Sequence, residues 1–265
     1  IGYDQYSIRQ KILNSLPDGV FLHIMIKPNW VIHQESEDFP IEALVTSSEL
    51  IEMVVDACLE KYPCALSITV GDVPLQSCNF KKLTNQIGLE KLIDKYEQLV
   101  SPSVKFIDLR REKWELKNGF MTLNESVESD PKGYSLVSLG LESLLEEVSK
   151  FSKHFRVSDY DPIETESAHS PGKHNYLISN SVLESDLFIN LPKMKTHQKS
   201  GITGALKNLV GINGSKAYLV HHRLGKAKNG GDEFSDSTSF IILLPVRFRE
   251  FFQKKSRILF RILRY

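Results

Sequence analysis

The sequence is poor in cysteine and lacks the marks of a redox, secreted or membrane-spanning protein. Its three cysteines are too few for a disulfide framework, and they form no C-x-x-C motif for a metal or cluster. They are Cys58, Cys64 and Cys78. No secretion signal and no uninterrupted apolar run of membrane length is visible. We therefore expect a protein of a reducing, cytoplasmic compartment, with Cys58 in its core.

The chain also lacks net charge, although its basic residues are unevenly placed. The 33 Lys and Arg residues balance 33 Asp and Glu residues, yet residues 240–265 contain seven basic residues and one acidic residue. The rest of the chain is therefore acidic, which argues against nucleic-acid binding by the body of the protein. The basic segment includes many apolar side chains, which predicts an amphipathic helix. We expect this helix to pack against a part of the same domain outside this sequence. The alternative is that it lies on an anionic membrane surface.

What the sequence does contain is enough apolar material for a folded core. Its composition, 41% hydrophobic and 25% charged, is typical of a globular protein, and 265 residues allow one large domain or two small ones. The chain begins at Ile1 without a methionine and ends inside an apparently helical run. We expect it to be a fragment of a longer protein.

Strand and helix patterns alternate along the first part of the chain. The expected strands span 19–26, 65–70 and 104–109, and the expected helices span 47–61 and 83–99. Thr46 and Glu49 have capping-box spacing at the start of the first helix, and Gly88 weakens the second. Two further strands, at 175–178 and 186–191, are expected to return to the same sheet. The pattern predicts an α/β fold, a mainly parallel sheet with helices on both faces.

A polar, turn-rich stretch interrupts this pattern at 112–173. We interpret it as a cap or insertion with one helix near 141–151. The expected organisation is an α/β domain over 1–239 that includes this insertion, followed by the basic amphipathic segment at 240–265.

Polar or proline-stopped segments follow four of the expected strands. They are Lys27-Pro28-Asn29, Gly71-Asp72-Val73-Pro74, Asp108-Leu109-Arg110 and Pro192-Lys193. Ligands of open parallel sheets bind at the carboxyl ends of the strands, so we expect a cleft with Asn29, Asp72, Arg110 and Lys193 at one edge. The alternative for any one segment is that its proline ends a strand and its charge faces water.

The segment Leu191–Gly211 carries the densest set of chemically useful residues. Glycines that admit a ligand to the backbone, a threonine and several lysines precede or open a short helix, a combination that favours a carboxylate or phosphate guest. The candidate cofactor-binding or anion-binding residues are Lys193, Lys195, Gly201, Thr203, Gly204, Lys207 and Asn208. The Walker pattern is absent, which argues against nucleotide triphosphate hydrolysis.

Three residues are candidates for catalysis and two for metal binding. His197 and Lys207 are the main catalytic candidates, and Asp72 is a candidate acid, base or metal partner. The alternative for His197 is a loop histidine bonded to the backbone. His221 and His222 are candidate metal ligands, although adjacent residues on regular structure cannot both point the same way.

These motifs resemble the domain-of-unknown-function family 362 (DUF362), from about Phe21 to Phe234. The resemblance rests most on Asn190-Leu-Pro-Lys-Met-Lys-Thr-His197 and Thr203-Gly204-Ala-Leu-Lys207-Asn208. Some members carry an appended four-iron ferredoxin module, but this chain has no cysteines for one, so no iron–sulfur cluster is expected here. The resemblance implies an α/β domain and no established reaction.

A second set of residues is similar to a motif of the nickel-pincer lactate racemases. It comprises His197, Gly201, Gly204, Lys207 and Gly211, followed by the two adjacent histidines. The resemblance implies that Lys207 anchors a nickel-pincer-type nucleotide covalently, that His197 moves a proton, and that His221 or His222 ligates nickel. The chain departs from that family at Gly71-Asp72-Val73-Pro74, where the racemases have Gly-x-His-Arg.

Three functions follow from the sequence. The first is an enzyme that binds a small anionic substrate or cofactor at the strand carboxyl ends, with racemase-like or isomerase-like chemistry as one form. The second is a non-catalytic, anion-binding accessory protein in redox or polysaccharide pathways. The third is a partner of a membrane surface through the basic segment.

Overall fold

The chain divides into two compact units, each described here by itself. The computed structural model describes residues 5–36, 38–117, 120–125, 129–157, 160, 162–197 and 200–245. The first unit comprises Ile1–Lys113, Glu125–Tyr134 and Ile178–Gly214, and the second comprises Trp114–Asn124, Ser135–Leu177 and Ser215–Tyr265. Of the predicted site residues, His221 and His222 belong to the second unit and all the others belong to the first.

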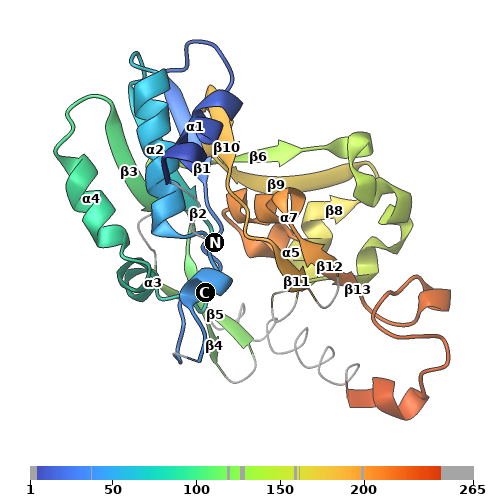
Figure 1. Cartoon of the computed structure of the whole chain (residues 1–265). Helices are drawn as coiled ribbons and strands as arrows, with labels where there is room; N and C mark the ends of the chain where they lie inside the picture. Colours follow the sequence, from blue (N-terminus) through green and yellow to red (C-terminus); the bar gives the residue numbers. More distant parts are fainter. Residues whose placement is uncertain are drawn as a thin grey trace. The chain divides into compact units, whose positions relative to one another are not determined.

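A four-stranded parallel sheet forms the centre of the first unit (Figure 1). Its strands are β10 (Leu187–Asn190), β1 (His23–Lys27), β2 (Ser67–Asp72) and β3 (Ser103–Asp108), in that spatial order. Ile24 lies beside Ile68, Ile26 beside Ile189, and Gly71 beside Ile107. The predicted parallel sheet is therefore confirmed, together with the neighbouring positions of its apolar runs.

Helices cover both faces of this sheet, as the sequence predicts for an α/β fold. They are α1 (Gln5–Ser15), α2 (Ser48–Lys61), α3 (Phe80–Gln86), α4 (Leu89–Glu97) and the short α6 (Asn180–Leu183). Ile24 and Ile68 share a buried core with Ile51 of α2. Met25 packs on the other face, with Val182 of α6 nearby in a smaller cluster. Cys58 is fully buried, and burial raises the pKa of its thiol to about 12.

The helix boundaries correct two details of the sequence prediction. Gly88 adopts a left-handed conformation, with φ at 67°, and separates α3 from α4, so the expected helix over 83–99 is two helices. The N-cap of α2 is Ser47, whose hydroxyl accepts from the Leu50 N–H at 3.4 Å. The capping role predicted for Thr46 is wrong, because the Thr46 hydroxyl bonds elsewhere, as described below.

The second unit is built from small sheets and 3-10 turns. One sheet has the order β6 (Tyr134–Ser138), β9 (Lys173–Ser179), β8 (His169–Ser170), and β7 (Phe155–Arg156) pairs antiparallel with β13 (His222–Arg223). Strand β4 (Lys113–Lys117) pairs with β5 (Phe120–Glu125). The helices are η2 (Gly140–Glu142), η3 (Leu144–His154), α5 (Pro162–Ala168), η5 (Lys216–Tyr218) and η6 (Ala227–Asn229).

Two sequence predictions for this region are corrected. The strand expected at 175–178 does not return to the parallel sheet, because β9 pairs with β8 and β6 instead. The helix expected near 141–151 is present as the 3-10 helices η2 and η3. The predicted domain boundaries, at 112–173 and 239, stay predictions.

The basic C-terminal segment lies mostly outside the described residues. Residues 240–245 are helical, and the predicted amphipathic character and membrane contact of 246–265 fall beyond them. Within the described part of the chain, no helix combines the length and apolar character needed to cross a membrane.

Candidate functional site

The strand order of the first unit creates a switch point between β1 and β10. From β1 the chain moves to β2 and then β3 on one side, whereas β10 pairs with the other side of β1. Open α/β sheets bind ligands at the carboxyl ends of two such strands. Lys195 Nζ, after β10, lies 3.3 Å from Asn29 Oδ1, after β1, so both segments meet at one edge as predicted. We call this place the β1–β10 switch point.

A buried ion pair lies at the carboxyl end of β1. Lys27 Nζ is 2.7 Å from Asp72 Oδ1, and the two side chains are 0% and 5% exposed. The Asp72 carboxylate also accepts from the backbone N–H groups of Trp30 at 2.6 Å and Val73 at 2.7 Å. Burial lowers the pKa of Lys27, and the neighbouring Asp72 charge opposes that shift. Asp72 thus lies where the sequence placed it, while its predicted catalytic or metal-binding role stays a prediction.

Asn208 joins the ends of β1 and β10. Its Nδ2 donates to Asn190 Oδ1 at 2.7 Å and to the Lys27 carbonyl at 3.2 Å, and its Oδ1 accepts from Lys27 Nζ at 3.1 Å. The side chain is buried, so its amide is engaged within the protein. Asn208, a predicted cofactor-binding residue, therefore supports the framework beneath the switch point.

Thr46 forms a second link between the same two strand ends. Its hydroxyl donates to the Leu191 carbonyl at 2.8 Å and accepts from the Asn29 N–H at 2.9 Å. These bonds satisfy backbone groups just beyond β10 and β1, and they explain why Thr46 does not cap α2. The sequence marks Thr46 as a residue that hydrogen-bonds backbone groups. Its partners are Leu191 and Asn29, and not the start of α2.

Gly211 packs directly against the buried ion pair. A Cβ at this position would overlap Asp72 Oδ1 and lie 2.7 Å from Lys27 Nζ. The Gly211 carbonyl also accepts from the Val73 N–H at 3.0 Å. The motif therefore requires glycine here for close approach and not for an unusual backbone angle.

The central motif folds as a hairpin followed by one helical turn. Strand β11 (Lys195–His197) pairs antiparallel with β12 (Gly201–Thr203), and α7 (Ala205–Asn208) leads into η4 (Leu209–Ile212). Gly201, with φ at 74°, occupies the left-handed region that favours glycine. The Thr203 hydroxyl is buried, 3.2 Å from the carbonyls of Lys193 and Lys195. The four residues of α7 that follow Gly204 are too few for the helix-start anion site that the sequence suggested.

Three lysines of this motif, Lys193, Lys195 and Lys207, form what we call the lysine cluster. Lys195 is half-buried, and its Nζ donates to the Leu44 carbonyl at 2.7 Å as well as to Asn29. Burial lowers the pKa of Lys195, Lys193 and Lys207 lower it further, and Asp72 opposes them. Among the described residues, no carboxylate forms an ion pair with any member of the cluster. The cluster therefore presents net positive charge.

The predicted histidines occupy two different units. His197 is half-buried in β11, where its Nδ1 accepts from the Ser200 N–H at 3.1 Å. His222 lies in β13, and the backbone N–H of His221 donates to the Arg156 carbonyl at 2.9 Å. In the part of the chain that the structure describes, no group of three or more His, Cys, Asp or Glu side chains is placed to hold a metal. The catalytic role of His197 and the metal-ligand roles of His221 and His222 stay predictions.

Arg110, predicted at the same edge as Asp72, is fully engaged inside the protein. Its guanidinium pairs with Asp108 at 2.5 Å and donates to the carbonyls of Leu75 and Cys78 at 3.0 Å. These bonds hold the loop after β2 in place. Arg110 is 1% exposed, so no donor group of its guanidinium lies at the surface.

A buried polar cluster in the second unit was missed from the sequence. His169 Nδ1 lies 3.3 Å from His174 Nδ1, and His174 Nε2 lies 2.9 Å from Glu146 Oε2. His169 Nε2 lies 2.7 Å from the Tyr218 carbonyl. The sequence feature that could have predicted this cluster is two histidines five residues apart on either side of a turn. Strands β8 and β9 place these two histidines opposite each other.

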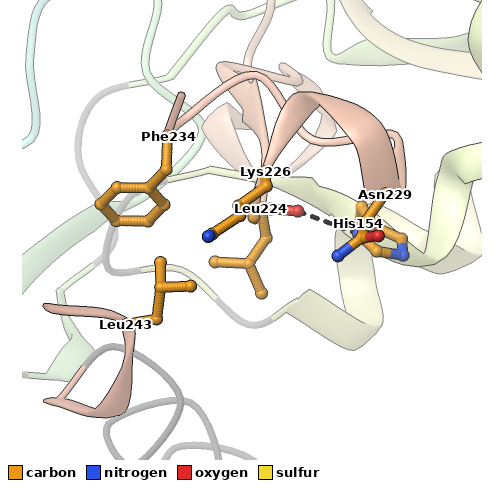
Figure 2. Close-up of a pocket in the computed structure, with 7 residues that line it drawn as sticks. His154, Leu224, Lys226, Asn229, Phe234 and Leu243 are labelled. Atoms are coloured by element: carbon orange, nitrogen blue, oxygen red, sulfur yellow. Dashed lines mark hydrogen bonds between the residues drawn. The ribbon is translucent and has the colours of Figure 1, made fainter. Parts of the chain in front are cut away.

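A small cavity also lies in the second unit, and Figure 2 shows the residues around it. Its volume is about 110 Å³, and its lining is largely apolar, with Leu224, Phe234 and Leu243. His154 Nδ1 donates to the Leu224 carbonyl at 2.9 Å, so that ring nitrogen is engaged. No predicted site residue lines the cavity. We give more weight to the β1–β10 switch point, because it gathers charged groups able to recognise a ligand.

Comparison with known proteins gives one match. The model of the family described as "Domain of unknown function (DUF362)" matches residues 116–255, more than half of the chain. No curated protein and no solved structure matches. None of the comparisons supports the resemblance to lactate racemases.

The match includes the Leu191–Gly211 motif, with the hairpin, the lysine cluster and Asn208. It begins at residue 116, so Lys27, Thr46 and Asp72 lie outside it, although the sequence resemblance was traced from about Phe21. The residues that form the switch point thus come partly from the matched region and partly from the sheet that precedes it. The chain belongs to the DUF362 family.

Proposed function

We propose that the protein binds a small anionic molecule, a carboxylate or a phosphate, at the lysine cluster beside the β1–β10 switch point, and acts on it as an enzyme. The observation that carries the proposal is the positive charge that Lys193 and Lys207 place beside Lys195, which no described carboxylate neutralises by an ion pair. Charged groups without a carboxylate counter-charge at the carboxyl ends of parallel strands are suited to a ligand of opposite charge.

Some of the surrounding residues hold the strand ends in place, and another is placed to contact a ligand. The buried Lys27–Asp72 pair, Asn208 and Thr46 fix the ends of β1 and β10. Lys207 is exposed on α7 and is free to move toward a guest. Because the ends of β1 and β10 are already fixed before a ligand binds, less entropy is lost on binding.

A second candidate function is anion binding without catalysis. The observation in its favour is that the Asp72 carboxylate, one of three predicted catalytic groups, already accepts from Lys27, Trp30 and Val73. An acid or base with all its partners inside the protein is poorly placed to exchange a proton with a substrate.

Replacing Lys207 with methionine tests the site. Both residues are good helix formers and Lys207 is exposed, so stability should change little. Isothermal titration with inorganic phosphate, and separately with citrate, should show a loss of affinity of about tenfold to a hundredfold, the contribution of one charge-assisted contact.

The control is Lys91→Met, the same substitution at an exposed position of α4. It should bind phosphate as the wild type does. The proposal is wrong if the wild type binds neither phosphate nor citrate more tightly than chloride, or if Lys207→Met and Lys91→Met behave alike.

A further inference from the structure

Lys195 differs from the other members of the lysine cluster in the kind of contacts that its amine makes. Its Nζ donates to two neutral oxygens, the Leu44 carbonyl at 2.7 Å and Asn29 Oδ1 at 3.3 Å. An ammonium group has three donors, so these contacts leave one position open. Neutral acceptors orient an uncharged amine as well as an ammonium group, because an uncharged amine still has two N–H donors.

The surroundings of Lys195 also favour the uncharged amine. The side chain is half-buried, and burial is the largest cause of its lowered pKa. Lys193 and Lys207 add like charge, which disfavours the ammonium form, and the opposing attraction comes from Asp72, whose carboxylate is already paired with Lys27. A desolvated lysine beside other cations is the arrangement that activates an amine as a nucleophile.

We infer that Lys195 is a nucleophilic lysine that condenses with the carbonyl group of a small 2-oxo acid, whose carboxylate is held by Lys193 and Lys207. This inference rests on the proposed function, because it takes the anionic ligand at the lysine cluster and assigns its class. The open position on the Lys195 amine is suited to the carbonyl group of such a ligand. The charges of Lys193 and Lys207 are suited to the carboxylate next to it.

The step conserves atoms and electrons without a redox partner. The Nζ lone pair attacks the carbonyl carbon and forms a C–N bond, while the carbonyl π electrons move to oxygen. Proton transfer from nitrogen and loss of the oxygen as water then leave an imine. Adjacent positive charge stabilises the oxygen as negative charge develops on it.

Trapping with pyruvate and sodium borohydride tests the inference on the whole chain. Borohydride reduces an imine to a stable secondary amine, so intact mass should rise by one reduced pyruvate adduct, and peptide mapping should place it on Lys195. Lys195→Arg keeps a long basic side chain but cannot form the imine, and should lose the adduct. Lys91→Arg, on exposed α4, should keep it.

Three outcomes separate this inference from the proposed function. Phosphate binding by the wild type without any adduct overturns the nucleophile and leaves the anion site standing. Absence of both phosphate binding and adduct overturns both. An adduct spread over many lysines, or retained in Lys195→Arg, shows non-selective modification and also overturns the inference.

A second inference rests on an independent observation, the buried histidine pair of the second unit. A carbonyl oxygen can only accept, so the 2.7 Å contact of His169 Nε2 with the Tyr218 carbonyl requires hydrogen on that nitrogen. Glu146 faces the Nε2 of His174 at 2.9 Å, and the Gly172 N–H and His174 lower the pKa of that carboxyl. An ionised carboxylate also only accepts, so His174 Nε2 carries hydrogen as well.

Two neutral rings of this kind would face each other through two lone pairs, 3.3 Å apart at Nδ1. We propose that one proton lies between the two Nδ1 atoms, so that the pair carries a single positive charge balanced by Glu146. Burial, His174 and Lys173 lower the pKa of His169, which disfavours a positive charge on its ring. Tyr176, whose ring lies 5.3 Å from His169, is a further titratable neighbour.

At about pH 8 a free histidine holds almost no proton, so a proton retained by the pair at that pH would be held by the geometry of the two rings.

Nitrogen-15 NMR of the histidine rings in the whole chain, at about pH 8, tests this proposal. One ring of the pair should show two protonated nitrogens and the other ring one. Glu146→Gln removes the balancing charge and should lose the shared proton at a lower pH than the control Glu142→Gln on exposed η2. Two neutral rings at that pH overturn the proposal, as does a signal that changes when EDTA removes a bound metal.

Discussion

Replacing Gly211 with alanine is expected to destabilise the first unit by about 3–5 kcal/mol, the cost of breaking a buried ion pair. The added methyl group would overlap Asp72 Oδ1 and lie 2.7 Å from both Cε and Nζ of Lys27. Neither partner has room to withdraw, because both side chains are buried and Asp72 is also held by two backbone N–H groups. The clash must therefore separate the pair or move the η4 turn.

Urea unfolding followed by tryptophan fluorescence measures this loss. Trp30 is fully buried in the first unit, so a Trp114→Phe background restricts the signal to that unit. Gly204→Ala is the matched control from the same motif, since nothing lies within 4 Å of a Cβ there, and it should cost less than about 1 kcal/mol. Equal losses in the two variants would show that the approach of Gly211 to the ion pair is unimportant.

The second large effect is expected for Asp72→Asn, again about 3–5 kcal/mol of lost stability. The amide leaves the buried Lys27 ammonium without a counter-charge, and its single oxygen cannot replace both carboxylate oxygens toward Trp30 and Val73. The matched control is Glu52→Gln. Glu52 lies at the same 2.7 Å from Lys95, but that pair is solvent-exposed and should contribute less than about 1 kcal/mol.

The pH dependence of Asp72→Asn identifies the cause. The Asp72 charge raises the pKa of Lys27 against the effect of burial, so its removal lowers that pKa further below the ordinary 10.5. Between the folded and unfolded pKa values the unfolded chain binds more protons, and stability rises as the pH rises through that window. In the variant, the pH range between the folded and unfolded pKa values of Lys27 extends to lower pH. The stability that the variant loses relative to the wild type should therefore shrink toward alkaline pH. A deficit independent of pH would mean that Lys27 is not the source.

The sequence by itself determined the four strands of the parallel sheet and the helix α2 of the first unit. Apolar runs set β1, β2, β3 and β10, because a strand buried on both faces needs a continuous apolar segment. The left-handed conformation of Gly88 follows from its missing Cβ, and the sequence marked that position as the weak point of the helix. The carboxyl-edge location of Asn29, Asp72 and the Pro192-Lys193 segment followed from parallel topology alone.

The partners of individual side chains were decided only by the tertiary structure. Lys27 and Asp72 are far apart in sequence, and their pairing depends on β1 and β2 lying side by side with a glycine above them. The local sequence allowed Thr46 either to cap α2 or to bond a distant backbone group. In the folded protein its hydroxyl donates to the Leu191 carbonyl, which is far away in sequence. Residues 175–178 had a strand pattern, but periodicity cannot state which sheet a strand joins. The buried pair of His169 and His174 likewise needed Glu146 and Tyr218 from other elements, because long-range contacts, not local propensity, satisfy buried polar groups.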